Sequence, residues 1–171
     1  MKDYAMENMS VINRNNLKSD FMKKEDYIKA HKGTVISCHD VFIFYRGGIL
    51  LVKRKNFPEK NNLWAIGGRI KRGMDTEESL KQKTLEETGL EIEKIKFLGI
   101  GRTLFKTDPF GHGKGTDTLN LVYFAVGKGK LKLNGLHEEP IIVNSKNYKS
   151  FRFNPYIKEF LEKSFRIIER K

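Results

Sequence analysis

The sequence is poor in cysteine and has no long apolar run. Cys38 is the one cysteine among 171 residues, so an intrachain disulfide and a zinc cage built from cysteines are both excluded. No stretch reaches the ~18 apolar residues that a membrane-spanning helix needs, and residues 1–20 lack the apolar core of a signal peptide. We therefore expect a cytoplasmic protein without a membrane partner, because a reducing compartment suits an unpaired thiol.

Positive charge exceeds negative charge. The chain has 33 lysines and arginines against 21 acidic residues, which gives a formal net charge of +12. Because the lysines are spread along the whole chain, we favour a solvated surface over a nucleic-acid interface. A positive field also attracts an anionic small molecule such as a nucleotide sugar. The composition leaves a homodimer open.

Apolar residues form 39 % of the chain, and their patterning predicts one α+β domain. We expect this domain to cover residues 21–171 and residues 1–20 to form an N-terminal extension. Residues 20–30 fit either a short helix or an edge segment. A C-terminal helix is predicted to begin at Asn154-Pro155, where a cap and a first-turn proline lie together. Strand patterns cover residues 35–38, 41–44, 49–52, 63–66, 92–103 and 119–126.

The clearest predicted helix covers residues 75–88. Asp75 can cap its N-terminus, and Gly89 supplies a left-handed stop after its last turn. Leu80, Thr84 and Leu85 are expected to lie on its inner side.

The candidate chemistry lies in a glycine pair followed by this helix with its acidic end. Gly67 and Gly68 let backbone carbonyls turn toward a ligand without side-chain obstruction. Glu86 and Glu87 supply oxygen ligands of the kind that a hard cation prefers, and Arg69 is a planar donor suited to a diphosphate group. Two acids at the negative end of a helix carry a mild cost, which favours a compensating cation.

The spacing of this segment resembles the Nudix box, which runs from a glycine through a helix to a Glu-Glu-x-Gly ending. The resemblance implies the Nudix fold, a mixed β-sheet sandwiched between helices. It also implies a hydrolase of nucleoside diphosphate derivatives. The matching positions are Gly68, Glu86, Glu87, Gly89 and Leu90.

Met74, Gln82 and Lys83 depart from the box, where the family has Glu, Arg and Glu. Lys83 precedes Glu86 and Glu87 by about one helical turn, so the three can share a helix face. A cation in place of a carboxylate makes the site less negative. We therefore expect one Mg²⁺ or none, rather than several metal ions.

Longer segments are similar to the GDP-mannose mannosyl hydrolase branch of this family, which has a degenerate box and acts at the sugar carbon. The similarity covers roughly residues 21–138, and its matching segments are residues 21–27, 53–58, 64–69, 115–118 and 137–139.

That resemblance implies the ligands of a metal ion. Gly67 would offer its carbonyl and Glu87 its carboxylate to Mg²⁺, with Mn²⁺ as an alternative, and Glu86 is a further candidate ligand. Leu136 stands where the branch has a metal-binding glutamine.

The same resemblance implies how the bond breaks. His137 would act as the general base on water that attacks the anomeric carbon. Arg54 and Arg69 would stabilise the departing GDP, and Asp40 matches an aspartate near the nucleotide. The expected reaction converts GDP-mannose into GDP and mannose.

Two other functions stay open. A pyrophosphohydrolase of nucleoside diphosphate derivatives or capped RNA would depend on Glu86 and Glu87. A catalytically inactive Nudix module that binds a nucleotide would explain why box positions are replaced. Trp64 is expected in the core rather than as a platform for a base, and residues 110–115 fit either a lid or a plain hairpin connection.

Overall fold

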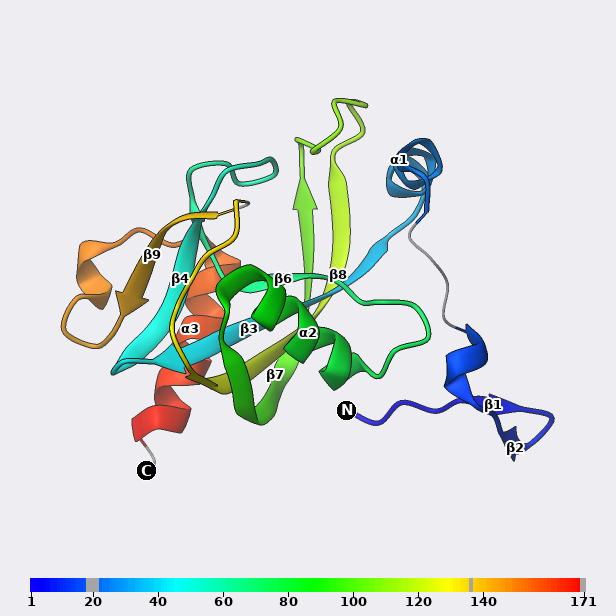
Figure 1. The fold of residues 1–171 in the computed structure, drawn as a ribbon. Helices are drawn as coiled ribbons and strands as arrows, with labels where there is room; N and C mark the ends of the chain where they lie inside the picture. Colours follow the sequence, from blue (N-terminus) through cyan, green and yellow to red (C-terminus); the bar gives the residue numbers. More distant parts are fainter. Residues whose placement is uncertain (18–21, 136, 170–171) are drawn as a thin grey trace.

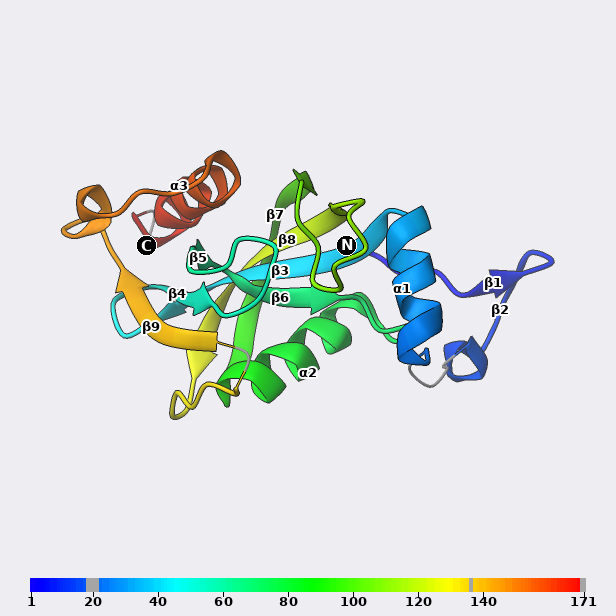
Figure 2. The ribbon, with the colours of Figure 1, turned by 90° about the horizontal axis from the view of Figure 1, so that it is seen from above.

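The computed structural model describes residues 1–17, 22–135 and 137–169, and these form an α+β fold (Figure 1). A mixed sheet is the middle layer, with helix α2 (Thr76–Thr88) on one face and helix α3 (Pro155–Glu169) on the other (Figure 2). The predicted fold class, a mixed sheet sandwiched between helices, is confirmed.

Two long strands that run parallel, β3 (Ile36–Tyr45) and β8 (Thr116–Lys128), form the centre of the sheet. Its order is β5-β4-β3-β8-β7, and β6 pairs with β3 while β9 pairs with β4. The start of β3 pairs with β6 and its end with β4, so the sheet divides along this edge. The remaining strands of the sheet are β4 (Gly48–Arg54), β5 (Leu63–Trp64), β6 (Ile66–Arg69), β7 (Glu91–Phe105) and β9 (His137–Val143).

The core lies on both faces of the sheet. Val41 and Ile43 pack on the α2 side with Leu80, whereas Phe42 packs on the α3 side with Phe160. Successive side chains of a strand point to opposite faces. Because both faces of β3 are covered, its apolar residues form a continuous run rather than an alternating pattern.

Local signals set the ends of α2 as predicted. Asp75 Oδ1 accepts a hydrogen bond from the Glu77 N–H at 3.0 Å, and Gly89 takes a left-handed φ of 67°. The prediction that Leu85 faces inward is wrong, because its side chain is 50 % exposed. Leu85 is about 140° around the helix from Leu80, so both cannot face the sheet. The buried positions are Thr76, Ser79, Leu80, Thr84, Glu87 and Thr88.

The N-terminal residues contact the start of α2. The Asp3 carboxylate accepts hydrogen bonds from the N–H and the hydroxyl of Thr76, both at 2.9 Å, and Arg14 donates to Asp75 at 2.8 Å. The predicted boundary at residue 20 falls within residues 18–21, outside the described residues, and stays a prediction. Residues 1–17 contain the short strands β1 (Met6–Glu7) and β2 (Ser10–Val11) and a 3-10 helix (Arg14–Leu17).

Two further elements complete the described chain. Residues Lys24–Gly33 form helix α1, which decides between the two structures that the sequence left open. A short 3-10 helix (Tyr148–Ser150) lies between β9 and α3. None of the described helices is both long enough and apolar enough to cross a membrane.

Candidate functional site

The glycine pair lies on β6, beside the first half of β3. Gly67 pairs with Asp40, and Gly68 pairs with His39. A Cβ at Gly67 would collide with Asp40 Oδ1, and a Cβ at Gly68 would lie 2.9 Å from Lys83 Cε. Gly67 therefore makes room for Asp40 and for the backbone of the paired strand, and Gly68 makes room for Lys83.

Glu87 is the buried acid of the site, with a side chain that is 4 % exposed. Its Oε1 lies 2.7 Å from Lys83 Nζ, and its Oε2 lies 3.0 Å from His137 Nε2. Burial alone would raise the pKa of Glu87, but the hydrogen bonds from His137 and Lys83 and the charge of Lys83 bring that pKa below its usual value. Glu87 is therefore ionised at neutral pH, with both oxygens engaged.

His137 reaches the site because β9 pairs with β4, where His137 lies opposite Arg54. An ionised carboxylate only accepts hydrogen bonds, so His137 Nε2 is assigned as the donor to Glu87. In the neutral ring Nδ1 is then an acceptor. This buried Nδ1 has no hydrogen-bond partner among the described residues. A carboxylate that orients an imidazole and leaves its second nitrogen as an acceptor is one requirement for a histidine that acts as a general base.

Arg54 ends strand β4 with its guanidinium largely inside the protein. Its buried Nε has no hydrogen-bond partner in the described part of the chain, and its Cζ lies 5.8 Å from the centroid of the Trp64 ring. Burial lowers the pKa of Arg54, whereas the charges of Asp40, Glu87 and Glu59 oppose that effect. The guanidinium stays charged and presents planar N–H donors that suit a phosphate group.

Asp40 connects the site to α3. Tyr156 donates a hydrogen bond to Asp40 Oδ2 at 2.6 Å. Burial raises the pKa of Asp40 to about 6, although the Tyr156 hydrogen bond and the Arg54 charge lower it. Burial and the Asp40 charge also raise the pKa of the Tyr156 hydroxyl. Asp40 therefore titrates much closer to neutral pH than an exposed aspartate does.

Two predicted site residues, Glu86 and Arg69, lie exposed at the rim. Glu86 Oε1 lies 2.9 Å from Lys71 Nζ, and Arg69 Cζ lies 3.7 Å from the centroid of the Tyr27 ring on α1. The predicted residues that the structure brings together are Asp40, Arg54, Gly67, Glu87 and His137.

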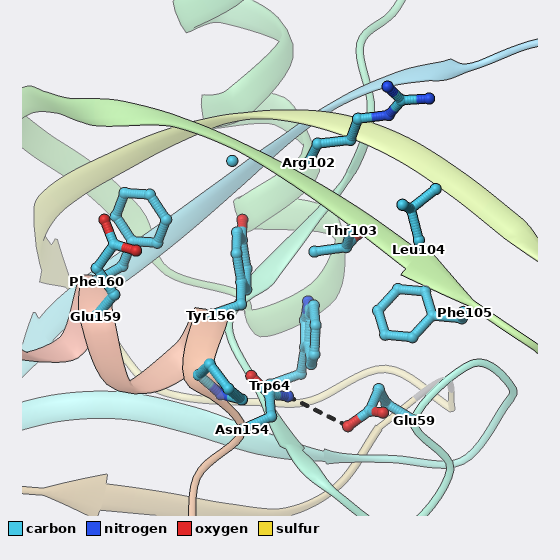
Figure 3. A pocket seen from close by; sticks show the side chains of 12 residues that line it. Glu59, Trp64, Arg102, Thr103, Leu104, Phe105, Asn154, Tyr156, Glu159 and Phe160 are labelled. Carbon is cyan, nitrogen blue, oxygen red and sulfur yellow. Dashed lines mark hydrogen bonds between the residues drawn. The ribbon is translucent and has the colours of Figure 1, made fainter.

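A cavity of about 420 Å³ lies next to this group, between β7 and α3. Figure 3 shows Tyr156, Trp64 and Phe105 in its wall. The Trp64 and Tyr156 rings stack with centroids 5.4 Å apart, and Phe105 meets Trp64 edge-on. Trp64 belongs to the core, as the sequence indicated, and also lines this cavity. Polar side chains of the wall are Glu59, Arg102, Thr103, Asn154 and Glu159.

Family membership rests on a long match. A family model described as the NUDIX domain matches residues 38–161, which include the glycine pair, α2 and His137. The chain belongs to the NUDIX domain family.

Solved Nudix structures share the fold. A MutT NUDIX hydrolase from Burkholderia pseudomallei has a TM-score of 0.59 at 20 % identity, covering 76 % of this chain and 98 % of that chain. The NUDIX domain of Shewanella oneidensis NrtR, complexed with ADP ribose, has a TM-score of 0.61 at 14 % identity over 86 % and 99 %. A C. elegans Ap4A hydrolase has a TM-score of 0.57 at 14 % identity over 80 % and 100 %. At these identities the likeness shows the fold and leaves the substrate open.

Nudix hydrolases generally use a divalent metal, usually Mg²⁺, but the donor set of this Nudix chain does not fit a resident metal ion. Both Glu87 oxygens are engaged by Lys83 and His137, and Glu86 is paired with Lys71. Among the described residues, no group of three or more His, Cys, Asp or Glu side chains could hold a metal. Each carboxylate that the sequence offered as a ligand already has a cationic partner.

Sequence reasoning missed Tyr156, which holds Asp40. Nothing local marks a tyrosine on an amphipathic helix as the partner of a distant aspartate, so no sequence signal was available. Leu136, at the position of a metal-binding glutamine in the resembled branch, lies outside the described residues.

The connection between β7 and β8, residues 106–115, packs against α1. Asp108 accepts hydrogen bonds from backbone N–H groups within this loop, and His112 Nε2 lies 2.8 Å from His31 Nδ1 of α1. The loop is thus a hairpin connection held against a helix, and its action as a lid stays a prediction.

Proposed function

We propose that this Nudix protein hydrolyses a nucleoside diphosphate sugar at the anomeric carbon, with GDP-mannose as the first candidate substrate. The observation that carries this proposal is the 3.0 Å contact between His137 Nε2 and Glu87, which leaves the His137 Nδ1 lone pair as an acceptor. This candidate base and the half-buried Arg54 lie on paired strands. This combination suits a reaction in which water is deprotonated while a diphosphate leaves.

The proposed step is a substitution at carbon. A water oxygen bonds to the anomeric carbon as the bond from that carbon to the diphosphate oxygen breaks with its electron pair. His137 Nδ1 takes a proton from the water, and Glu87 stabilises the imidazolium that forms. The diphosphate gains one negative charge, which Arg54 offsets. The products are a nucleoside diphosphate and a free sugar.

We assign the diphosphate to Arg54 and the nucleoside to the cavity beside Trp64. Arg54 links the two regions, because its charge interacts with Glu87 and also with Glu59 in the cavity wall. Stacked aromatic rings with a few polar groups suit a base and a ribose. Arg69 stays a predicted contributor to leaving-group stabilisation, from its position at the rim.

Attack at phosphorus is less well supported. Metal-assisted attack on phosphorus commonly uses one or two cations held by carboxylates. Glu86 and Glu87 are each paired with a lysine. Attack at carbon needs a base and a stabilised leaving group, which His137 and Arg54 provide.

A panel of nucleoside diphosphate sugars, including GDP-mannose, tests this function. Each is incubated with the protein in Mg²⁺ and separately in EDTA, and the products are separated and identified. We expect a nucleoside diphosphate and a free sugar from at least one member. His137→Gln should lower kcat by about 100- to 10,000-fold, as expected for loss of a general base.

The control is Glu139→Gln, also on β9, whose exposed side chain contacts Lys53. It should leave kcat unchanged. A nucleoside monophosphate and a sugar phosphate as products, or equal rates for His137→Gln and the wild type, would contradict the proposal.

A second candidate, a nucleotide-binding module without catalysis, is favoured by one observation. The 2.7 Å contact between Lys83 and Glu87 neutralises the main carboxylate of the site. The similar NrtR domain forms a complex with ADP ribose. Thermal stabilisation by a nucleotide, without turnover of any panel member, would favour this candidate.

A further inference from the structure

Lys83 places its ammonium group between the glycine pair and the buried acid. From α2 its side chain runs along Gly68, where a Cβ would lie 2.9 Å from Lys83 Cε and 3.5 Å from Nζ. The same Nζ lies 2.7 Å from Glu87 Oε1. The ammonium thus lies next to the Glu87 carboxylate and close to Gly68, the neighbour of the glycine whose carbonyl was expected to bind a metal ion.

The absence of a Cβ at Gly68 makes this position available. Gly68 has a φ of 155°, and any side chain there would press on the methylene groups of Lys83. Gly68 therefore leaves the space that the Lys83 side chain occupies, and the ion pair with Glu87 holds the end of that side chain. Because Glu87 is buried and Lys83 is only partly exposed, this ion pair is screened less by solvent than a fully exposed pair would be.

The charges around the site are already balanced by side chains. Glu87 has Lys83, Glu86 has Lys71, and the Asp40 carboxyl feels the charge of Arg54. A divalent cation here would meet ammonium and guanidinium groups. Each of these three carboxyl groups already has a cationic side chain as a neighbour. An incoming diphosphate, in contrast, would meet cations that can donate hydrogen bonds to it.

We propose that the Lys83 ammonium is a built-in cation that binds the diphosphate of the ligand directly, in place of a resident divalent metal. The choice of ligand rests on the proposed function, whereas the metal-free binding itself does not depend on turnover. An ammonium has three N–H donors, and the contact with Glu87 engages one of them. The Lys83 side chain is 25 % exposed, so a phosphate oxygen can reach it from solvent, with Arg54 as the second cation.

Binding of GDP and of inorganic pyrophosphate tests this proposal without requiring catalysis. Trp64 is the one tryptophan of the chain and lines the neighbouring cavity, so its fluorescence reports GDP, and calorimetry reports both ligands. We expect the wild type to bind both in EDTA, with affinities that change less than about threefold when Mg²⁺ is added. Lys83→Gln should weaken metal-free binding by about 10- to 100-fold, as expected for loss of a charged hydrogen bond.

Lys81→Gln is the matched control, because Lys81 is an exposed lysine of the same helix and the change in charge is identical. It should bind GDP as the wild type does. Lys83→Glu restores an acid at this position and should bind GDP only when Mg²⁺ is present. Circular dichroism and thermal unfolding establish that each variant is folded.

Measurements on the wild type keep the test independent of the variants. Electron paramagnetic resonance of Mn²⁺ should show no association with the protein alone. The proposal for Lys83 is overturned if the wild type needs Mg²⁺ or Mn²⁺ to bind GDP, or if it binds neither GDP nor pyrophosphate. Metal-free binding without turnover of any nucleotide sugar supports it and rejects the proposed hydrolysis instead.

Discussion

At the scale of single residues, the environment of Glu87 determines what the site can do. A buried carboxylate needs partners, and this one has a lysine on one oxygen and a histidine on the other. The lysine supplies charge, and the histidine gains an orientation that leaves Nδ1 as an acceptor. A single acidic side chain thus positions both a cation and a candidate base.

Adjacent residues on a helix point about 100° apart, which explains why only one of the paired acids is central. Glu87 is buried against the sheet, whereas Glu86 is exposed beside Lys71. The sequence motif named both acids but carried no information on which one faces inward. The resemblance predicted Asp40, Arg54 and His137, which lie far apart in the chain and which the structure brings together. Their roles stay predictions.

Asp40 makes a pH-dependent contribution to stability that can be measured. Its pKa is raised from 3.8 to about 6 by burial. Between these values the folded protein holds a proton that the unfolded chain has lost, so stability falls as pH rises through this window and then stays constant. Asp40→Asn keeps an acceptor for Tyr156 and has no charge to bury. The wild type loses free energy of unfolding as pH rises, and the variant does not lose this contribution. The free energy of unfolding of the variant minus that of the wild type should therefore increase by up to about 3 kcal/mol from about pH 4 to about pH 7.

Urea unfolding of the variant and of the wild type, each at about pH 4 and about pH 7, measures how the free energy of unfolding of each protein changes with pH. Equal pH dependence in the variant and the wild type would show that Asp40 titrates normally.

At the scale of elements, helices were easier to predict than the strand that completes the site. The ends of α2 are local: Asp75 caps one end and Gly89 stops the other. Strand β9 begins at His137 and contains Glu138, Glu139 and Pro140, residues that are uncommon in strands. It forms because its edge pairs with β4, and such a long-range pairing leaves no local signal.

The orientation of α2 predicts unequal costs for two identical substitutions. Leu80 is fully buried, whereas Leu85 is 50 % exposed. Leu80→Ala should lower the free energy of unfolding by about 2–5 kcal/mol because it leaves a cavity, and Leu85→Ala by less than about 0.5 kcal/mol. Denaturant unfolding of the two variants is the measurement, and similar losses would mean that the helix presents another face to the sheet.

At the scale of the whole molecule, layer architecture was predictable and strand order was not. Strands, one helix, further strands and a terminal helix predicted an α+β domain, and the Nudix resemblance implied a mixed sheet between helices. The pairing of β6 with β3 and of β9 with β4 depends on contacts between distant segments. The net charge of +12 favours the approach of an anionic ligand to the molecule as a whole. A homodimer stays a prediction.

The most direct test of the proposed function is the position of the bond that breaks. The protein is incubated with GDP-mannose, or with the panel member that it turns over, in ¹⁸O-water, and both products are analysed by mass spectrometry. Attack at the anomeric carbon by water deprotonated at His137 places the label in the free sugar and none in the nucleoside diphosphate. Label in a phosphate group would contradict the account, because it would place the attack at phosphorus.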